Sequence, residues 1–158
     1  MIYVTVGTMH LDFPRLIRAA DRYAAAREEE VIIQIGLGST VPTDATLFDF
    51  KPREEILEIQ RDARIIVTHA GIGSVIDALQ MEKPLIVVPR LKKFGEHNSD
   101  HQLELARAVH RRGWAVSLED IDDLMGRLDR PPPAYANYTP AKTSLIDSVR
   151  STISTLTE

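Results

Sequence analysis

The sequence contains no cysteine. Disulfide bonds, zinc–thiolate sites and a cysteine nucleophile are therefore excluded, and the composition suits a cytoplasmic protein. No apolar stretch approaches the roughly 20 residues that cross a bilayer. Residues 1–14 lack the basic start, apolar run and cleavage site of a signal peptide. We therefore expect any attachment to a membrane to come through another protein.

The chain also has no excess of positive charge, because its formal net charge is −4. Wholesale binding to nucleic acid or to an anionic membrane is not expected from this balance. Its 158 residues suffice for one good hydrophobic core but not comfortably for two domains. The hydrophobic share of 44% and the charged share of 27% are those of an ordinary globular domain.

Short apolar runs alternate with longer amphipathic segments along residues 1–129, which is typical of a parallel sheet covered by helices. Strands are predicted over 2–6, 31–36, 46–50, 64–68, 84–88 and 114–118. Helices are predicted over 13–27, 52–63, 74–81, 99–112 and 119–128, with Gly113 as a cap. The sequence thus predicts an α/β fold: one Rossmann-like, doubly wound parallel sheet over 1–129.

The three consecutive prolines that end the segment 130–133 break this pattern, since they cannot continue a helix. Beyond them, apolar residues near helical spacing predict one more amphipathic helix in a tail over 130–158. This tail would dock against a partner or fold back on its own domain.

The most informative segment is 65–77, where a strand ends in a glycine-bearing turn and a helix follows directly. Free backbone N–H groups and the positive end of the helix dipole then converge on one point, ready to bind a diphosphate. Gly71 and Gly73 let the backbone approach a ligand. Ser74 can add a hydroxyl while capping the helix, and Asp77 can accept both hydroxyls of a ribose. A bare G-x-G-S pattern is also common in strand-to-helix turns that bind nothing.

Two further motifs follow this turn in a characteristic order. The segment His69-Ala70-Gly71-Ile72-Gly73-Ser74 with Asp77 is followed by Lys83-Pro84-Leu85-Ile86-Val87-Val88-Pro89, then by Asp100-His101-Gln102 and Ala106. In this combination the chain resembles, from residue 1 to about 118, the nucleotide-sugar half of family 28 glycosyltransferases of the GT-B fold. It is most similar to PssE-type subunits of bacterial exopolysaccharide synthesis, which resemble the catalytic half of the two-subunit dolichol-linked UDP-N-acetylglucosamine transferase.

The resemblance implies a role for each matched residue. Gly71, Gly73 and Ser74 would hold the diphosphate of a UDP-sugar, with His69 beside it, and Asp77 would bind the ribose. The remaining implied contacts are Gln102 with Asp100 or His101 at the sugar hydroxyls, Gly7 and Thr8 at the opposite lip of the cleft, and Phe50 or Lys51 beside the uracil. The sequence does not name the sugar.

His69 is expected to act electrostatically, as a cation that helps the leaving diphosphate depart, and not as a general base. His97 and His101 stand at helical spacing but lack carboxylate or cysteine support. The resemblance also implies no bound metal or other cofactor. Lys92, Lys93 and Arg90 are predicted to form a solvated loop face; alternatively, they approach phosphate groups of the donor or of a lipid acceptor.

The implied reaction is inversion at the sugar C1 by an acceptor hydroxyl, which needs a general base. The chain offers no convincing base, although His10 could face the cleft. The resemblance therefore implies a second, membrane-anchored subunit of PssD type that binds a lipid-linked saccharide and recruits this cytoplasmic chain to the inner face of the membrane.

Three other functions compete with this hypothesis. A non-catalytic nucleotide-binding or regulatory module stays open, because a doubly wound fold alone decides no function. An NAD-binding domain is disfavoured, since Gly7-Thr8-Met9-His10 is not G-x-G-x-x-G. A sugar epimerase of GT-B type would need about twice this length.

Overall fold

The computed structural model describes residues 1–136 and 138, and within them six parallel strands form one sheet in the order β3-β2-β1-β4-β5-β6. The strands are β1 Ile2–Thr5, β2 Val31–Gln34, β3 Thr46–Phe48, β4 Ile65–His69, β5 Leu85–Val88 and β6 Val116–Ser117. The α-helices are α1 Pro14–Ala26, α2 Arg53–Asp62, α3 Ile72–Gln80, α4 His101–Arg111 and α5 Leu124–Asp129. The predicted α/β doubly wound sheet is confirmed.

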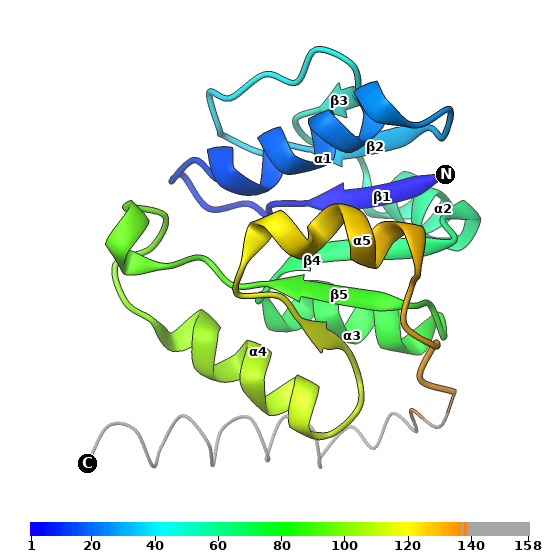
Figure 1. Ribbon diagram of the computed structural model, residues 1–158, viewed down its shortest axis with the longest axis vertical. Coiled ribbons are helices and arrows are strands. Elements are labelled where there is room, and N and C mark those ends of the chain that lie inside the picture. The colour runs from blue at the N-terminus through cyan, green and yellow to red at the C-terminus, as the bar shows by residue number, and fades with distance from the viewer. Residues whose placement is uncertain (137, 139–158) are drawn as a thin grey trace.

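Helices cover both faces of the sheet, as Figure 1 shows for α1 and α5 on one of them. Successive residues of a central strand point alternately into two hydrophobic cores, one on each face of the sheet. Ile2 and Val4 of β1 pack with residues of α1 and α5. Tyr3, between them, packs in the other core with residues of α2, α3 and α4. Two apolar faces on every central strand explain the nearly continuous apolar runs in the sequence.

The strand order places a switch point between β1 and β4. From β1 the chain moves outward to β2 and β3, then returns to β4 on the other side and continues to β5 and β6. The loops after β1 and β4 therefore leave the sheet in opposite directions. In open parallel sheets, a crevice forms at the carboxyl ends of the strands at such a point.

Several element boundaries differ from the predicted ones. The helix predicted over 119–128 begins only at Leu124, because Asp120 accepts a hydrogen bond from Asp122 N and starts the 3₁₀ turn η2, Ile121–Asp123. The helix predicted over 99–112 begins at His101. Gly113 follows that helix with a left-handed φ of 69°, as its expected capping role requires.

The chain after the prolines returns to its own domain in its described part. Tyr135 and Tyr138 both lie against Trp114, with ring centroids 6.2 Å apart in each pair. The predicted tail helix falls on residues 139–158, outside the described residues. No described helix is long and apolar enough to span a bilayer.

Candidate functional site

A cleft of about 400 Å³ opens at the switch point between β1 and β4. Seven of the residues predicted for the site line it together: Gly7, Thr8, His69, Gly71, Gly73, Ser74 and Asp77. They come from the loop after β1, the end of β4 and the first turns of α3. The tertiary structure thus gathers into one cleft two segments that are 60 residues or more apart in the chain.

The turn from β4 into α3 presents unpaired backbone donors to this cleft. The helix begins at Ile72, two residues earlier than predicted, with Gly71 as its N-cap. Ser74 therefore lies inside the first turn and its side chain does not cap the helix, contrary to expectation. The first N–H groups of a helix have no acceptor within it. Together with the helix dipole, they make this end of α3 suited to an anion.

The imidazole of His69 is enclosed by two glycines. A Cβ on Gly7 would lie 2.4 Å from His69 Cε1, and one on Gly71 would lie 2.1 Å from His69 Nε2. Gly7 also has a left-handed φ of 78°, which disfavours any other residue there. The position of the His69 ring therefore requires glycine at residues 7 and 71. In contrast, a Cβ on Gly73 would meet no atom within 4 Å.

Enclosure changes the charge expected of His69. Burial, together with the nearby positive charge of Arg90, lowers the pKa of the imidazole to about 4. The imidazole is therefore neutral near pH 7 in the free protein. The cationic form expected beside a bound diphosphate stays a prediction.

Asp77 has a partner that sequence reasoning missed. Arg53, at the start of α2, donates two hydrogen bonds across the cleft to its carboxylate, at 3.0 and 2.8 Å. Asp77 is 16% exposed and Arg53 69%, so the pair lies at the mouth of the cleft. A cation in the first turn of a helix opposes the helix dipole. Glu54 and Glu55 directly after Arg53 already place negative charge in this first turn, so the sequence carries little sign of the pair with Asp77.

Polar side chains in the floor of the cleft were also missed. Gln34 Oε1 accepts hydrogen bonds from Thr5 Oγ1 at 2.7 Å and from the hydroxyl of Tyr3 at 3.0 Å. Burial raises the pKa of the Tyr3 hydroxyl to about 12, so it stays a donor. Gln60 of α2 is buried beside them, with no partner for its Oε1 among the described residues. Thr5 and Gln34, which interrupt apolar strands, carried the available signal.

The two residues expected beside the nucleobase differ in their position relative to the cleft. Lys51 lines the cleft, where its ammonium also pairs with Glu55 at 2.8 Å. Phe50 is not among the lining residues and is 50% exposed.

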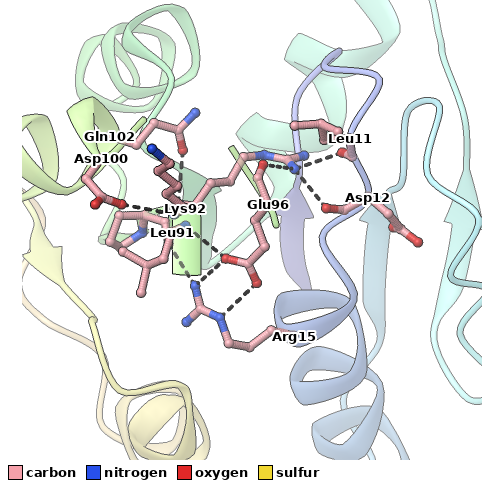
Figure 2. A network of polar contacts seen from close by, with 10 residues as sticks. Leu11, Asp12, Arg15, Leu91, Lys92, Glu96, Asp100 and Gln102 are labelled. Atoms are coloured by element: carbon pink, nitrogen blue, oxygen red, sulfur yellow. Dashed lines mark hydrogen bonds and ion pairs between the residues drawn. The ribbon is translucent and has the colours of Figure 1, made fainter. Parts of the chain in front are cut away.

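The structure does not bring Asp100, His101 and Gln102 into the lined cleft. They lie at the start of α4, after the loop that follows β5. Gln102 Oε1 accepts a hydrogen bond from Arg90 N at 3.1 Å (Figure 2). Because Val88 pairs with His69 in the sheet register, this loop leaves the sheet beside His69. The three residues thus flank the cleft at its His69 end.

The sequence predicts that Arg90 belongs to a solvated loop face. This prediction is wrong, because Arg90 is fully buried. Its Nη1 donates to the carbonyl oxygens of Leu11, Asp12 and Glu96 at 2.8, 3.0 and 3.2 Å, and its Nη2 donates to Val6 O at 2.8 Å. Loop carbonyls solvate the guanidinium in place of water. The two lysines beside it are exposed, as expected.

Among the described residues, no group of three or more His, Asp or Glu side chains could hold a metal ion. His97 Nδ1 accepts a hydrogen bond from Ser99 N at 3.0 Å. His101 lies 3.6 Å from Glu104 on the exposed side of α4. His10 is exposed on the loop after β1.

Comparison with known proteins finds one matching family model and several curated relatives. The sequence model described as the glycosyltransferase family 28 C-terminal domain matches residues 1–150. The human UDP-N-acetylglucosamine transferase subunit ALG13 is 32% identical over 121 residues, 71% of this chain and 10% of the human protein. The Eremothecium gossypii protein of the same name is 38% identical over 98 residues, 56% of this chain and 45% of that protein. The chain thus spans about a tenth and less than half of these two relatives.

Solved structures share the fold. The solution structure of ALG13 matches with a TM-score of 0.60 at 18% identity, covering 91% of this chain and 93% of that one. The calicheamicin glycosyltransferase CalG4 matches with a TM-score of 0.62 at 18% identity, covering 95% of this chain and 37% of that one. The single sheet described above therefore corresponds to one part of the longer calicheamicin glycosyltransferase.

Proposed function

The chain belongs to the glycosyltransferase family 28 C-terminal domain family, and from that premise we propose that it is the donor-binding part of a glycosyltransferase that uses a UDP-sugar. The observation that carries the proposal is the cleft at the switch point, where the start of α3 presents free N–H groups between His69 and Asp77. Relatives named as UDP-N-acetylglucosamine transferase subunits support the choice of nucleotide.

The cleft suggests an orientation for the donor. The diphosphate lies against the N–H groups of Gly73 and Ser74. The nucleoside extends toward Asp77 and Lys51, where a carboxylate accepts ribose hydroxyls. The sugar extends the other way, past His69, because the loop after β5 flanks that end.

In the proposed reaction an acceptor hydroxyl attacks the sugar C1, the bond from C1 to the diphosphate oxygen breaks with inversion, and UDP leaves. The N–H groups at the start of α3 stabilise the charge that develops on the diphosphate, an effect often worth several kcal/mol. A bound diphosphate also favours the protonated imidazole, so donor binding raises the pKa of His69. The proton of the acceptor hydroxyl goes to a base outside this chain.

We extend the proposal to the setting of the reaction. The acceptor is a lipid-linked saccharide in exopolysaccharide or related glycan synthesis, held by a membrane-anchored subunit of PssD type. The chain works on the cytoplasmic side of the membrane and needs no metal. The name "subunit" carried by the relatives supports dependence on a partner.

Calorimetric titration with UDP tests the donor site. Gly73→Asp places a carboxylate at the anion site without a clash, since a Cβ there meets nothing within 4 Å. Gly126→Asp is the matched control, because Gly126 in α5 is equally open and lies outside the cleft. We expect wild type and Gly126→Asp to bind UDP, and Gly73→Asp to lose binding.

The outcomes separate the functions under consideration. Equal UDP binding by all three proteins would exclude the α3 site. UDP binding without transfer, even with an acceptor-binding partner added, would favour a non-catalytic nucleotide-binding module.

A further inference from the structure

We propose that Arg15, Glu96 and Arg90 form a positioning network that sets how Gln102 and Asp100 face the sugar of the donor. The network lies between the loops after β1 and β5, outside the lined cleft, and Figure 2 shows its polar contacts. The inference rests on the proposed function, because it assigns residues to the recognition of a UDP-sugar.

Glu96 joins the end of the loop after β5 to its beginning, which makes it a closed loop. Its carboxylate accepts a hydrogen bond from Leu91 N at 3.0 Å, and its own N–H donates to Leu91 O at 3.3 Å. The guanidinium of Arg90 donates to Glu96 O at 3.2 Å. Each end of the segment from Arg90 to Glu96 therefore holds the other.

Arg15 then attaches this closed loop to α1. Its Nε and Nη2 donate to the two carboxylate oxygens of Glu96 at 3.0 and 2.9 Å, and Nη2 also donates to Pro89 O at 2.8 Å. Such a paired arrangement fixes direction as well as distance. Arg90 makes a second attachment through its hydrogen bonds to carbonyl oxygens of the loop after β1.

The closed loop determines which atoms of the two sugar-facing residues stay available. Gln102 Oε1 accepts from Arg90 N at 3.1 Å, and Asp100 Oδ1 accepts from Lys92 N at 2.9 Å. The amide of Gln102 is thereby oriented with Nε2 as its free donor. Asp100 keeps Oδ2 as an acceptor. A donor and an acceptor at fixed positions are what discriminates one pattern of sugar hydroxyls from another.

Burial argues that the ion pair of Arg15 and Glu96 serves orientation more than stability. Arg90 is fully buried and Glu96 is 1% exposed. The guanidinium of Arg15 pairs with the Glu96 carboxylate, whereas that of Arg90 donates only to main-chain carbonyl oxygens. Arg90 Nε and Arg15 Nη1 have no partner among the described residues. Apolar side chains in such places are often at least as stabilising as buried ion pairs, so geometry is the better explanation for charges here.

Calorimetric titrations with UDP and with a panel of UDP-sugars test the inference. Glu96→Gln keeps the shape of the side chain but removes its charge, and Arg15→Lys keeps the charge but loses the paired geometry. We expect both variants to bind the preferred UDP-sugar about tenfold more weakly, the cost of one or two misplaced hydrogen bonds. Affinity for UDP, which has no sugar, should change less than about twofold.

Two further variants serve as the positive and the negative control. Gln102→Ala removes the proposed sugar contact itself and should reproduce the loss for UDP-sugars alone. Glu119→Gln breaks a comparable pair with Arg107, held by hydrogen bonds of 2.6 and 2.8 Å on the exposed side of α4. It should leave both affinities unchanged.

The outcomes distinguish this inference from the proposed function. Wild-type protein that binds neither UDP nor any UDP-sugar refutes the proposed function, and the inference with it. Ligand binding in which both network variants retain wild-type UDP-sugar affinity overturns the inference alone. Equal weakening for UDP and UDP-sugars also overturns it, because it would indicate a general loss of structure.

Discussion

At the scale of single residues, His69 shows how the surrounding groups set the charge of a side chain. It ends β4 at the centre of the sheet, where Gly7 and Gly71 leave room for its ring. The same enclosure removes water from the imidazole and lowers its pKa to about 4. The histidine is thereby kept neutral near pH 7 in the free protein.

The stability of the protein should reflect this pKa. The pKa of His69 is about 4 in the folded protein and near its ordinary value of 6.5 in the unfolded chain. Between these values the unfolded state binds more protons, so the free energy of unfolding falls as pH is lowered from 6.5 to 4, by at most about 3 kcal/mol. Urea unfolding across this range should show the fall in wild type and in the exposed-site control His10→Asn. His69→Asn should make it less steep, leaving the part due to carboxyl groups whose pKa is lowered, such as those of Asp12 and Glu29. An unchanged slope would contradict the assignment.

The two glycines of the turn should respond oppositely to alanine. Gly71→Ala drives a methyl group into the imidazole of His69 and should lower the free energy of unfolding by about 1–3 kcal/mol. Gly73→Ala adds a methyl group to a helical position in open space and should raise it by up to about 1 kcal/mol. Urea denaturation of both variants measures the difference. Similar effects at the two positions would show that His69 is not confined as described.

At the scale of elements, the carboxyl ends of the strands carry the site through loops that hold one another. Arg90, just after β5, reaches four loop carbonyl oxygens, three of them on or after β1. A positive charge buried under polar loops joins elements that the sheet register alone does not connect.

Removal of this charge should therefore loosen both loops. Arg90→Met leaves buried carbonyl groups without donors and should lower the free energy of unfolding by about 3–5 kcal/mol. Arg27→Met is the control, because Arg27 pairs with Asp129 in an exposed contact between α1 and α5, and exposed pairs contribute little. Urea unfolding midpoints compare the two. A loss as small in Arg90→Met as in the control would refute the role of Arg90.

At the scale of the whole molecule, protection from solvent falls from the centre of the sheet to its edges. Every residue of β1 and β5 is buried, whereas Thr46 and Leu47 of the edge strand β3 are exposed. Strands that are buried and hydrogen-bonded on both sides open to solvent slowly, so their amide hydrogens exchange slowly.

Amide hydrogen exchange should follow this order. We expect the slowest exchange in β1, β4 and β5 and much faster exchange in β3, measured by mass spectrometry or NMR at neutral pH. Bound UDP should further slow exchange at the start of α3. Exchange in β1 as fast as in β3 would contradict the strand order.

Much of this protein follows from its sequence. Apolar runs and amphipathic segments determined the α/β class, because periods of 2 and 3.6 are local properties of the chain. The glycine-bearing turn before α3 was visible for the same reason. Element ends were less predictable, as at Asp120, where a side chain competes with the backbone for the first turn of a helix.

Only the tertiary structure decided the charges around the site. Arg53 meets Asp77 across 24 residues, and Arg15 meets Glu96 across 81. Arg90 stands shortly before the exposed Lys92 and Lys93, so its sequence context predicts solvent, yet the loops after β1 and β5 enclose it. Burial, and with it the pKa of His69, depends on which distant segments meet, and local periodicity carries no information about that.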